Sequence, residues 1–369
     1  MIRRLYIHNF RCLENFELRL AGLSSILLIG KNGAGKTTIG AALEVLQKIG
    51  RGAARVGDLV TPRDLPRGKE RAPMRFELEV ELDGVVYAYC VVFELPERFR
   101  ELRVSEEVLQ VGGEEAVSRN LSQILLNRTD TRFGLDWHSV ALPIIHQAPG
   151  RDPISAFRKW LANALVLRPV PKFFRGASVS GSPYPEPEVA NFGEWFSGLV
   201  GSEPAAYVQI DKYLKEALPD FHSLKNREVG EENRSIDVRF STSQNHSDFR
   251  IEELSDGEKC FLVYALVIAA NDAFGPLLCF WDEPDNFLAP EEVGASMIAL
   301  RRAFRSKGQL IVTSHNPEAI RHFSEENTLM VYRSSHFEPT RWSTVQELRE
   351  SGVVVGGFVE ALVRGDVEP

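Results

Sequence analysis

The fold of this 369-residue chain is decided by the stretch Ser25-Ile26-Leu27-Leu28-Ile29-Gly30-Lys31-Asn32-Gly33-Ala34-Gly35-Lys36-Thr37-Thr38. An apolar run of strand length leads into a glycine-rich loop, and the loop opens a helix in which Ile39, Leu43 and Leu46 have helical spacing. The pattern G-x-x-x-x-G-K-[ST] therefore stands in the strand–loop–helix context that it requires. The stretch predicts a phosphate-binding loop in an α/β protein.

The chemistry of such a loop explains its residue types. Gly30, Gly33 and Gly35 let the backbone wrap closely, so that successive N–H groups point at phosphate oxygens. The N-terminus of the following helix adds its partial positive charge. We expect Lys36 to reach the β- and γ-phosphates and Thr37 to offer its hydroxyl to Mg²⁺. The residues expected to bind the nucleotide here are Asn32, Gly33, Ala34, Gly35, Lys36, Thr37 and Thr38. The alternative, a glycine-rich turn that binds nothing, is disfavoured because the eight-residue pattern, the strand before it and the helix after it all fit a phosphate-binding loop.

Composition limits the class of protein. The net charge of −8 argues against a chain that coats nucleic acid indiscriminately, but it leaves room for a local basic patch. No apolar run approaches about 20 residues, so no membrane span is expected, and the N-terminus is too short and too polar for a signal peptide. Four cysteines are scattered without a C-x-x-C pair, which favours reduced thiols in a cytoplasmic protein.

Residues 51–75 form a basic stretch in this acidic chain. They contain seven Lys and Arg against three Asp and Glu, and the prolines and glycine among them predict an exposed loop. One interpretation is a landing site for DNA or RNA phosphates. The other is a solvated loop or a docking surface for an acidic partner protein, and the sequence alone leaves both open.

The remaining patterns divide the chain into three parts. Residues 1–111 hold the phosphate loop and an antiparallel side sheet, in which Asp83-Gly84 turns a hairpin between 76–82 and 85–93. Residues 112–225 are expected to form a mostly helical insertion, in which Trp137, Trp160 and Trp195 are packing residues, with base-stacking platforms as the less favoured alternative. Residues 226–369 complete the head with a long apolar helix, strands at 277–283 and 310–315, and edge strands at 328–333 and 340–343.

Two buried strands in the last part end in polar groups. The first ends in Asp282 and Glu283, and the second ends in His315. Because the carboxyl ends of parallel strands gather at the ligand crevice, these residues should lie beside Gly30. We expect Asp282 to hold Mg²⁺, Glu283 to act as the general base toward water, and His315 to sense the γ-phosphate. A plain Asp-Glu-Pro turn is the alternative for the first strand, and a lone core or surface histidine for the second.

The stretch Leu254-Ser255-Asp256-Gly257-Glu258 resembles the signature motif of ABC-type ATPases, although Asp256 stands where glycine is commoner. The order of phosphate loop, signature, Asp-Glu pair and histidine is similar to that superfamily. Ile7-His8-Asn9-Phe10-Arg11, the split by an insertion, and the stretch from Asp282 to Pro290 resemble the RecF/SMC/OLD branch more closely. These are soluble ATPases of DNA repair, chromosome handling and defence against mobile elements. The resemblance covers residues 1–95 and 230–345.

The resemblance implies a fold and a set of roles. The fold would be an α/β P-loop NTPase head of the ABC-ATPase type, with a mixed, largely parallel sheet, an antiparallel side sheet and a helical insertion. Ser255 and Gly257 of one subunit would contact the γ-phosphate held by another, so that two ATP molecules are sandwiched in a head-to-tail homodimer. Asp285 would link the two sites, Arg11 would reach nucleotide phosphate, and Gln147 would sense Mg²⁺ and the attacking water.

Departures from the branch shape the expected role. No heptad pattern predicts a long coiled coil, and little chain follows the last strand, so a nuclease domain is not expected here. The resemblance thus favours an ATPase that hydrolyses ATP with Mg²⁺, forms a dimer or a larger assembly, and controls a separate effector such as a nuclease in defence against phage. Alternatives are a DNA-clamping repair ATPase, a transporter subunit, and a scaffold that binds ATP and rarely turns it over.

Overall fold

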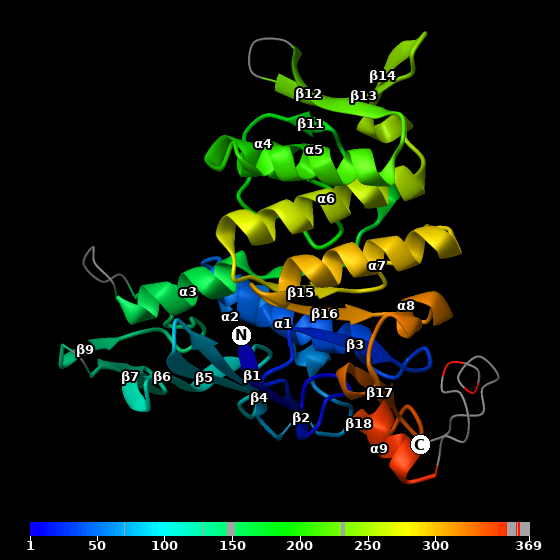
Figure 1. The fold of residues 1–369 in the computed structure, drawn as a ribbon. Coiled ribbons are helices and arrows are strands. Elements are labelled where there is room, and N and C mark those ends of the chain that lie inside the picture. Colours follow the sequence, from blue (N-terminus) through cyan, green and yellow to red (C-terminus); the bar gives the residue numbers. More distant parts are fainter. Residues whose placement is uncertain are drawn as a thin grey trace.

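The protein is built from two large sheets with helices between and above them, as a computed structural model shows (Figure 1). The structure describes residues 1–69, 71–127, 129–145, 152–229, 233–352, 359 and 361. In this part of the chain, no helix is long and apolar enough to cross a membrane.

The central sheet contains the phosphate-loop strand and has the order β10-β15-β16-β3-β17-β18. All neighbouring strands are parallel except β18, which runs antiparallel to β17. The expected mixed, largely parallel sheet is therefore confirmed. Its strands are β3 (Ser25–Ile29), β10 (Leu165–Leu167), β15 (Leu278–Trp281), β16 (Gln309–Thr313), β17 (Thr328–Tyr332) and β18 (Arg341–Thr344).

The second large sheet is antiparallel throughout and has the order β2-β1-β4-β5-β6-β7-β8-β9. Its strands are β1 (Ile2–His8), β2 (Phe16–Arg19), β4 (Met74–Leu82), β5 (Val85–Glu94), β6 (Arg103–Val111), β7 (Glu114–Asn120), β8 (Gln123–Leu126) and β9 (Thr131–Gly134). It is the side sheet expected from the alternating patterns, and it is wider than expected.

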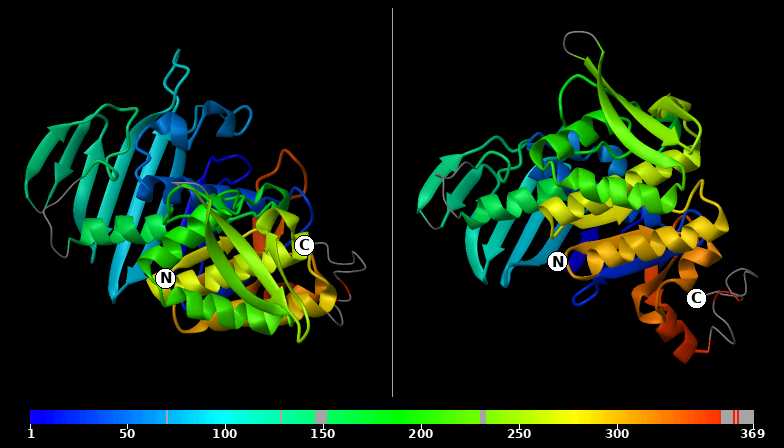
Figure 2. Two further views of the ribbon diagram at one scale, coloured as in Figure 1. Left: turned by 90° about the horizontal axis from the view of Figure 1, so that it is seen from above. Right: turned by 45° about the horizontal axis from the view of Figure 1, so that its top comes forward.

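Helices and a small third sheet complete the molecule. The helices are α1 (Lys36–Gly50), α2 (Val56–Leu59), α3 (Pro153–Asn163), α4 (Phe192–Ser202), α5 (Ala206–Ala217), α6 (Asp256–Phe274), α7 (Pro290–Arg305), α8 (Pro317–Arg321) and α9 (Val345–Glu350). The third sheet contains β11 (Ala177–Ser178), β12 (Phe221–Val229), β13 (Asn233–Ser241) and β14 (His246–Arg250). In Figure 1 it lies beyond α5 and α6, and both views of Figure 2 show it away from the antiparallel sheet.

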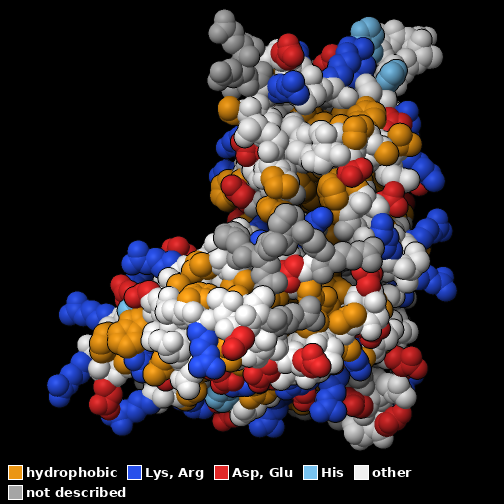
Figure 3. Space-filling view, turned by 90° about the vertical axis from the view of Figure 1, so that its left-hand side faces the viewer, with side chains coloured by type: hydrophobic (Ala, Val, Ile, Leu, Met, Phe, Trp, Pro, Cys, Tyr) orange, Lys and Arg blue, Asp and Glu red, His pale blue; other side chains and the backbone are white. Residues whose placement is uncertain are grey.

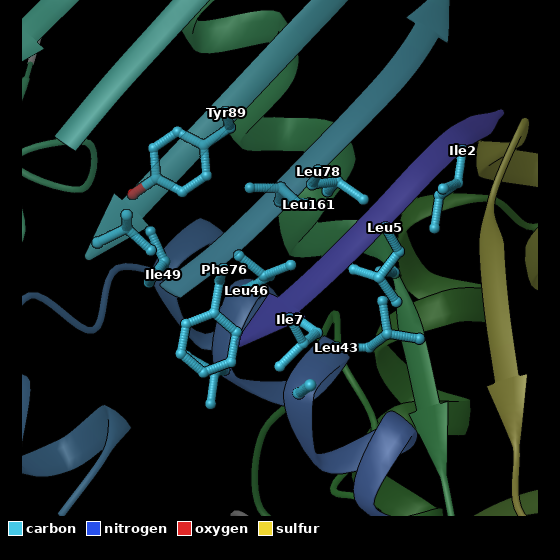
Figure 4. Packing of buried hydrophobic residues seen from close by; sticks show 14 of the residues in the cluster. Ile2, Leu5, Ile7, Leu43, Leu46, Ile49, Phe76, Leu78, Tyr89 and Leu161 are labelled. Carbon is cyan, nitrogen blue, oxygen red and sulfur yellow. The ribbon is translucent and has the colours of Figure 1, made fainter. Parts of the chain in front are cut away.

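Alternation along β3 explains why this strand lies between two layers. Ile26 and Leu28 pack into the core that α1 shares with the antiparallel sheet, whereas Leu27 and Ile29 pack toward α6 and α7. A strand that is buried on both faces has a continuous apolar sequence. Figure 4 shows the first of these cores, in which side chains of β1 and β4 meet Leu43, Leu46 and Ile49 of α1.

The expectation of a mostly helical segment over residues 112–225 differs from the structure in its first part. Strands β7, β8 and β9 occupy residues 114–134 and extend the antiparallel sheet. Strand β10 was not expected either, and it forms an edge of the central sheet beside β15. Trp160 and Trp195 are buried as expected, but Trp137 is 36% exposed. The local patterns were weak here because β8 and β9 have four residues each, β10 has three, and Leu121-Ser122 between β7 and β8 is not a typical turn sequence.

Candidate nucleotide-binding site

Sheet order brings the polar strand ends together. Strand β3 lies between β16 and β17, and β15 is the next strand beyond β16. Gly30, Asp282 and Ser314 directly follow β3, β15 and β16, so all three lie at the carboxyl edge of the sheet. A crevice at that edge is where open α/β sheets bind ligands.

Close packing under the loop explains two of its glycines. Gly30 has φ +145°, and a Cβ there would lie 1.9 Å from the carbonyl oxygen of Val331. Gly35 has φ +109°, and a Cβ there would lie 2.5 Å from Oγ1 of Thr340. The same Thr340 hydroxyl donates a hydrogen bond to the carbonyl of Ala34 at 2.9 Å. Only glycine fits both positions, so the loop keeps the tight curve that phosphate binding needs.

Lys36 points its ammonium into the curve of the loop. Its Nζ donates to the carbonyl oxygen of Gly30 at 2.7 Å and lies 2.9 Å from Nε2 of His315. Burial lowers the pKa of Lys36, while the nearby Glu283 and Asp282 carboxylates act in the opposite direction. The pKa of His315 is also lowered, first by burial and then by the charge of Lys36. A charged lysine that donates to a neutral histidine is consistent with both directions.

Asp282 is held by two hydroxyl groups. Thr37 Oγ1 donates to Oδ2 of Asp282 at 2.7 Å, and Thr313 Oγ1 donates to Oδ1 at 2.6 Å. Hydroxyl and carboxylate oxygens are the ligands that Mg²⁺ prefers, and the metal usually completes its shell with water and substrate phosphate. The pair of Thr37 and Asp282 therefore fits a Mg²⁺ ion bound beside the phosphate loop.

Glu283 has a left-handed backbone conformation, and Thr313 accepts a hydrogen bond from its N–H. Its φ is +52°, in the left-handed region, and its N–H donates to Thr313 Oγ1 at 2.9 Å. The carboxylate accepts a hydrogen bond from Asn286 Nδ2 at 2.8 Å, and its other oxygen lies 3.6 Å from Nε2 of His315. Strain of this kind is maintained only where surrounding contacts fix it, and it is found at functional sites. The turn aims the Glu283 carboxylate at the space in front of the loop.

Asp285 lies deeper than the other carboxylates. It is only 7% exposed and accepts a hydrogen bond from the Ser314 hydroxyl at 3.0 Å. Burial raises its pKa, and the Glu283 charge acts in the same direction. Its Oδ1 is buried and has no hydrogen-bond partner among the described residues.

A cavity of about 440 Å³ opens in front of the phosphate loop. It is lined by Arg11, Cys12, Asn32, Gly33, Gly35, Lys36, Thr37, Thr38, Glu283 and Arg333. An adjoining cavity of about 450 Å³ is lined by Lys31, Asn32, Glu283, Asp285, Asn286 and His315. Volumes of this size suit a small-molecule ligand. The structure thus brings the loop residues, both catalytic candidates and Arg11 to one place.

Arg11 reaches this cavity from the antiparallel sheet. It follows β1 with φ +52°, and its side chain pairs with Asp64, with 2.9 Å between Nε and Oδ1. The backbone N–H of Arg11 also donates to the carbonyl oxygen of Asp64, at 2.6 Å. Asp64 belongs to the basic stretch, so residues 51–75 are tied directly to a residue that lines the cavity.

The signature residues lie elsewhere in this chain. Ser255 is the N-cap of α6, where its hydroxyl accepts from the backbone of Glu258 at 3.3 Å and donates to the Glu258 carboxylate at 2.7 Å. A Cβ on Gly257 would lie 3.0 Å from the carbonyl oxygen of Phe287. Neither Ser255 nor Gly257 lines the two cavities at the phosphate loop. Gln147, expected to sense Mg²⁺, lies outside the described residues.

Sequence reasoning missed two residues of the site. Thr313 holds both Asp282 and Glu283, as described above. Arg333 follows β17 and donates to the carbonyl oxygens of Gly33 at 3.2 Å, Glu338 at 2.9 Å and His336 at 2.7 Å. No motif marks either residue. Only the sheet order, which puts β16 and β17 on the two sides of β3, shows that their ends belong to the site.

The arginines of the basic stretch differ in their surroundings, and some of them are buried or paired. Arg51 is half-buried, donates to the carbonyl oxygens of Ala162 and Ala164, and lies over the ring of Tyr184. Arg75 pairs with Glu77 and Glu106 within the antiparallel sheet. Arg55, Arg63 and Arg67 are exposed and have no ion pair among the described residues.

This fold and site define a P-loop ATPase of the RecF/SMC/OLD type. The family described as "AAA domain, putative AbiEii toxin, Type IV TA system" matches residues 25–321, and the chain belongs to it. A solved SMC head bound to the C-terminal winged-helix domain of ScpA is 16% identical, with a TM-score of 0.56 over 95% of this chain and 99% of that one. An SMC head with an extended coiled coil from Pyrococcus furiosus is 14% identical, with a TM-score of 0.53 over 95% and 98%.

The chain is also similar to one curated protein over a short segment. The OLD nuclease of Thermus scotoductus is 50% identical over 46 residues, which is 12% of this chain and 8% of that protein. The chain therefore matches only a small part of that relative's length.

Proposed function

We propose that this protein is an ATP-driven molecular switch that binds and hydrolyses ATP as a dimer and controls a separate effector. The observation that carries the proposal is that five groups meet at the phosphate loop. Lys36, Thr37 and Glu283 line one cavity, Glu283 and His315 line the adjoining one, and Asp282 accepts a hydrogen bond from Thr37. These are the groups that phosphoryl transfer needs: a cation for the phosphates, a metal site and a base for water.

Binding would use the loop as it stands. The backbone N–H groups of residues 32–38 would hold the phosphates, and Lys36 would exchange its contact with the Gly30 carbonyl for phosphate oxygen. Arg11 and Arg333 line the same cavity and would add positive charge at its rim. Thr37 and Asp282 would hold Mg²⁺, which would neutralise charge on the phosphates when bound.

Hydrolysis would depend on Glu283. Its carboxylate would accept a proton from the attacking water, and Asn286 fixes its orientation through the hydrogen bond to Oε2. His315 stands between Glu283 and Lys36, where a neutral imidazole can donate toward a γ-phosphate oxygen and accept from the lysine. This arrangement supports turnover over the alternative of a scaffold that rarely hydrolyses ATP.

Dimer formation would complete the site. Within one chain, Ser255 and Gly257 lie outside the phosphate cavities, so a second chain would have to supply them across the nucleotide. Asp285 would transmit the state of one site to the other, because it lies behind Glu283 and is bound to Ser314 beside His315. Larger assemblies of such dimers are compatible with this arrangement.

The biological role that we propose is defence against phage or other mobile elements, through an effector such as a nuclease. The support is the family description and the local likeness to a protein named OLD nuclease. A DNA-clamping ATPase of recombination or repair is the second candidate, favoured by the likeness of the fold to SMC heads. No observation favours the third candidate, a transporter subunit.

The test is the mass of the Glu283→Gln protein in solution, with and without ATP and Mg²⁺. The variant should trap ATP and shift from monomer to dimer, and Glu291→Gln on the exposed start of α7 should not. A second arm adds duplex DNA, which a clamp would retain only with ATP. A protein that stays monomeric with ATP and Mg²⁺, or whose assembly ignores both, would overturn the sandwich.

A further inference from the structure

Two aromatic side chains lie exposed at one end of the antiparallel sheet. Phe99, in the turn between β5 and β6, is 51% exposed, and Trp137 is 36% exposed. Their ring centroids are 6.5 Å apart, and the planes are nearly perpendicular at 84°. The backbone N–H of Val104 donates to the carbonyl of Trp137 at 2.7 Å, which fixes Trp137 beside the start of β6. The pair is thus held in place without being part of the core.

Three segments bring arginine residues to the neighbourhood of this pair. A β-bridge joins Arg55 to Ser139, and the N–H of Val56 donates to the carbonyl of His138, so the basic stretch meets the residues after Trp137. The guanidinium of Arg103 lies 5.1 Å from the centroid of the Trp137 ring. Arg98 and Arg100 flank Phe99 in the exposed turn.

The charges around the pair are not balanced. Two neighbouring carboxylates are already paired with arginine, Glu94 with Arg103 and Glu97 with Arg71, and the Asp136 carboxylate lies 3.4 Å from Nδ1 of His138. Among the described residues, five exposed arginines of these segments have no ion pair, namely Arg55, Arg63, Arg67, Arg98 and Arg100. Three described carboxylates of these segments, those of Asp58, Glu101 and Asp136, have no Lys or Arg partner. Figure 3 shows hydrophobic side chains with Lys and Arg side chains around them at the end of the molecule that carries the antiparallel sheet.

We propose that this aromatic–arginine surface, made of Phe99, Trp137, Arg55, Arg98 and Arg100, binds single-stranded nucleic acid. Bases would stack on the two rings, and the arginines would contact the phosphates. Stacking of this kind needs free base faces, which a duplex keeps inside its own stack, so the surface favours a single strand over a double helix. DNA and RNA offer the same faces and phosphates.

The basic stretch contacts both the nucleotide site and the turn that carries Phe99. Asp64 of the basic stretch pairs with Arg11, which lines the cavity at the phosphate loop. Arg71, from the same stretch, lies 3.9 Å from Glu97 in the turn that carries Phe99. The inference itself stands on the exposed rings and the unpaired arginines and does not require ATP hydrolysis.

The test uses the full chain and fluorescence anisotropy with a labelled oligothymidylate, an oligouridylate and a duplex, each of roughly 20 units, which exceeds one site of this class. We expect the single strands to bind more tightly than the duplex. Phe99→Ala and Trp137→Ala should each weaken single-strand binding by about 5- to 100-fold, the range for loss of one stacked base. Phe249→Ala on β14, where the ring is 39% exposed, is the matched control and should leave affinity unchanged.

Two further measurements distinguish direct contact with the nucleic acid from a loss of affinity caused by misfolding. Arg100→Ala should reduce the salt dependence of binding by roughly 0.7 in the log–log slope, whereas Arg305→Ala on α7 should not. Oligothymidylate should quench tryptophan emission in the native protein, and Trp137→Phe should keep most of the affinity and lose the quenching. The proposal would be overturned if the duplex bound as tightly as the single strands or more tightly, or if neither single strand bound. It would also be overturned if both Phe99→Ala and Trp137→Ala kept the native affinity.

Discussion

The hydroxyl of Thr37 donates a hydrogen bond to Asp282 at 2.7 Å, although the two residues are 245 positions apart in the chain. Thr37 lies in the first turn of α1, and Asp282 directly follows β15. The bond holds their two oxygens at a distance at which they can share one cation. The other carboxylate oxygen of Asp282 is fixed by Thr313. The pair that we propose to hold Mg²⁺ is therefore positioned by the protein's own hydrogen bonds, which lowers the cost of ordering it when ligand binds.

Replacing Glu283 with Gln should lower the ATPase rate by about 10²- to 10⁴-fold, the contribution of a general base. The amide keeps the shape and the partner Asn286 but cannot take a proton. ATP affinity should change little, so the measurement is the steady-state rate beside the dissociation constant of a fluorescent ATP analogue. Glu291→Gln should keep the native rate. A Glu283→Gln protein that hydrolyses ATP normally would exclude Glu283 as the base.

Replacing Lys36 with Met should raise the pKa of His315 in the nucleotide-free protein. That pKa is lowered by burial and then by the charge of Lys36, and the substitution removes the second cause. Histidine ring signals in an NMR titration, assigned with His315→Gln, give the pKa directly. An unchanged value would mean that the Lys36 ammonium does not act on the imidazole.

The same group makes stability depend on pH. Because the folded pKa of His315 lies below its unfolded value of about 6.5, the unfolded chain binds more protons between the two values. The contribution of neutral His315 to the free energy of unfolding is therefore full above about pH 6.5 and is lost as the pH falls through the folded pKa. Denaturant unfolding across this range should show a smaller slope with pH in His315→Gln than in the native protein. An equal slope in both proteins would contradict the assignment.

Replacing Thr313 with Val should damage both stability and hydrolysis. The change removes the acceptor for the backbone N–H of Glu283 and the donor to Asp282 while keeping the volume. Loss of a partner for a buried polar group costs about 1–3 kcal/mol in the free energy of unfolding. Thr328→Val is the control, since Thr328 is also buried and donates to the carbonyl of Ser324 at 2.8 Å, but at the opposite end of the sheet. If both variants lose the same ATPase activity, Thr313 acts only through stability.

Replacing Arg333 with Ala should weaken ATP binding by roughly 3- to 30-fold, because hydrogen bonds from a charged donor contribute about 1.5–3 kcal/mol and part of that is recovered by water. The guanidinium holds the Gly33 carbonyl and lines the cavity, so its loss loosens the loop. Isothermal titration with ATP measures the change. Arg305→Ala removes an exposed arginine of α7 and should have no effect, and equal affinities in the two variants would exclude Arg333 from the site.

The sequence predicted the parts of the fold that carry strong local patterns. The phosphate loop, the hairpin around Asp83-Gly84 and the buried strand ending in Asp282 each show a spacing that few other structures produce. Strands β7 to β9 were missed because Leu121 and Ser122, which connect β7 to β8, give no turn signal as clear as Asp83-Gly84. The three residues of β10 are too few to show any period.

The site was predictable where its residues belong to a motif. Lys36, Asp282, Glu283 and His315 are of this kind, and the structure brings them together. Thr313 and Arg333 act through hydrogen bonds to main-chain or side-chain atoms of other segments, and no local pattern encodes such bonds. The position of Ser255 away from the phosphate loop is consistent with the expected contact in trans, and the roles of these residues stay predictions until they are tested.

The place of β3 in the central sheet also bears on how the protein is made. Both neighbours of β3, which are β16 and β17, come from residues 309–332, whereas β3 itself comes from residues 25–29 and is translated long before them. Until those strands have been synthesised, β3 has no edge with which to pair, and its apolar residues stay exposed. The phosphate loop can therefore take its curve only after β16 and β17 have been translated. Nucleotide binding thus has to wait for a segment of the chain that is remote in sequence from the loop itself.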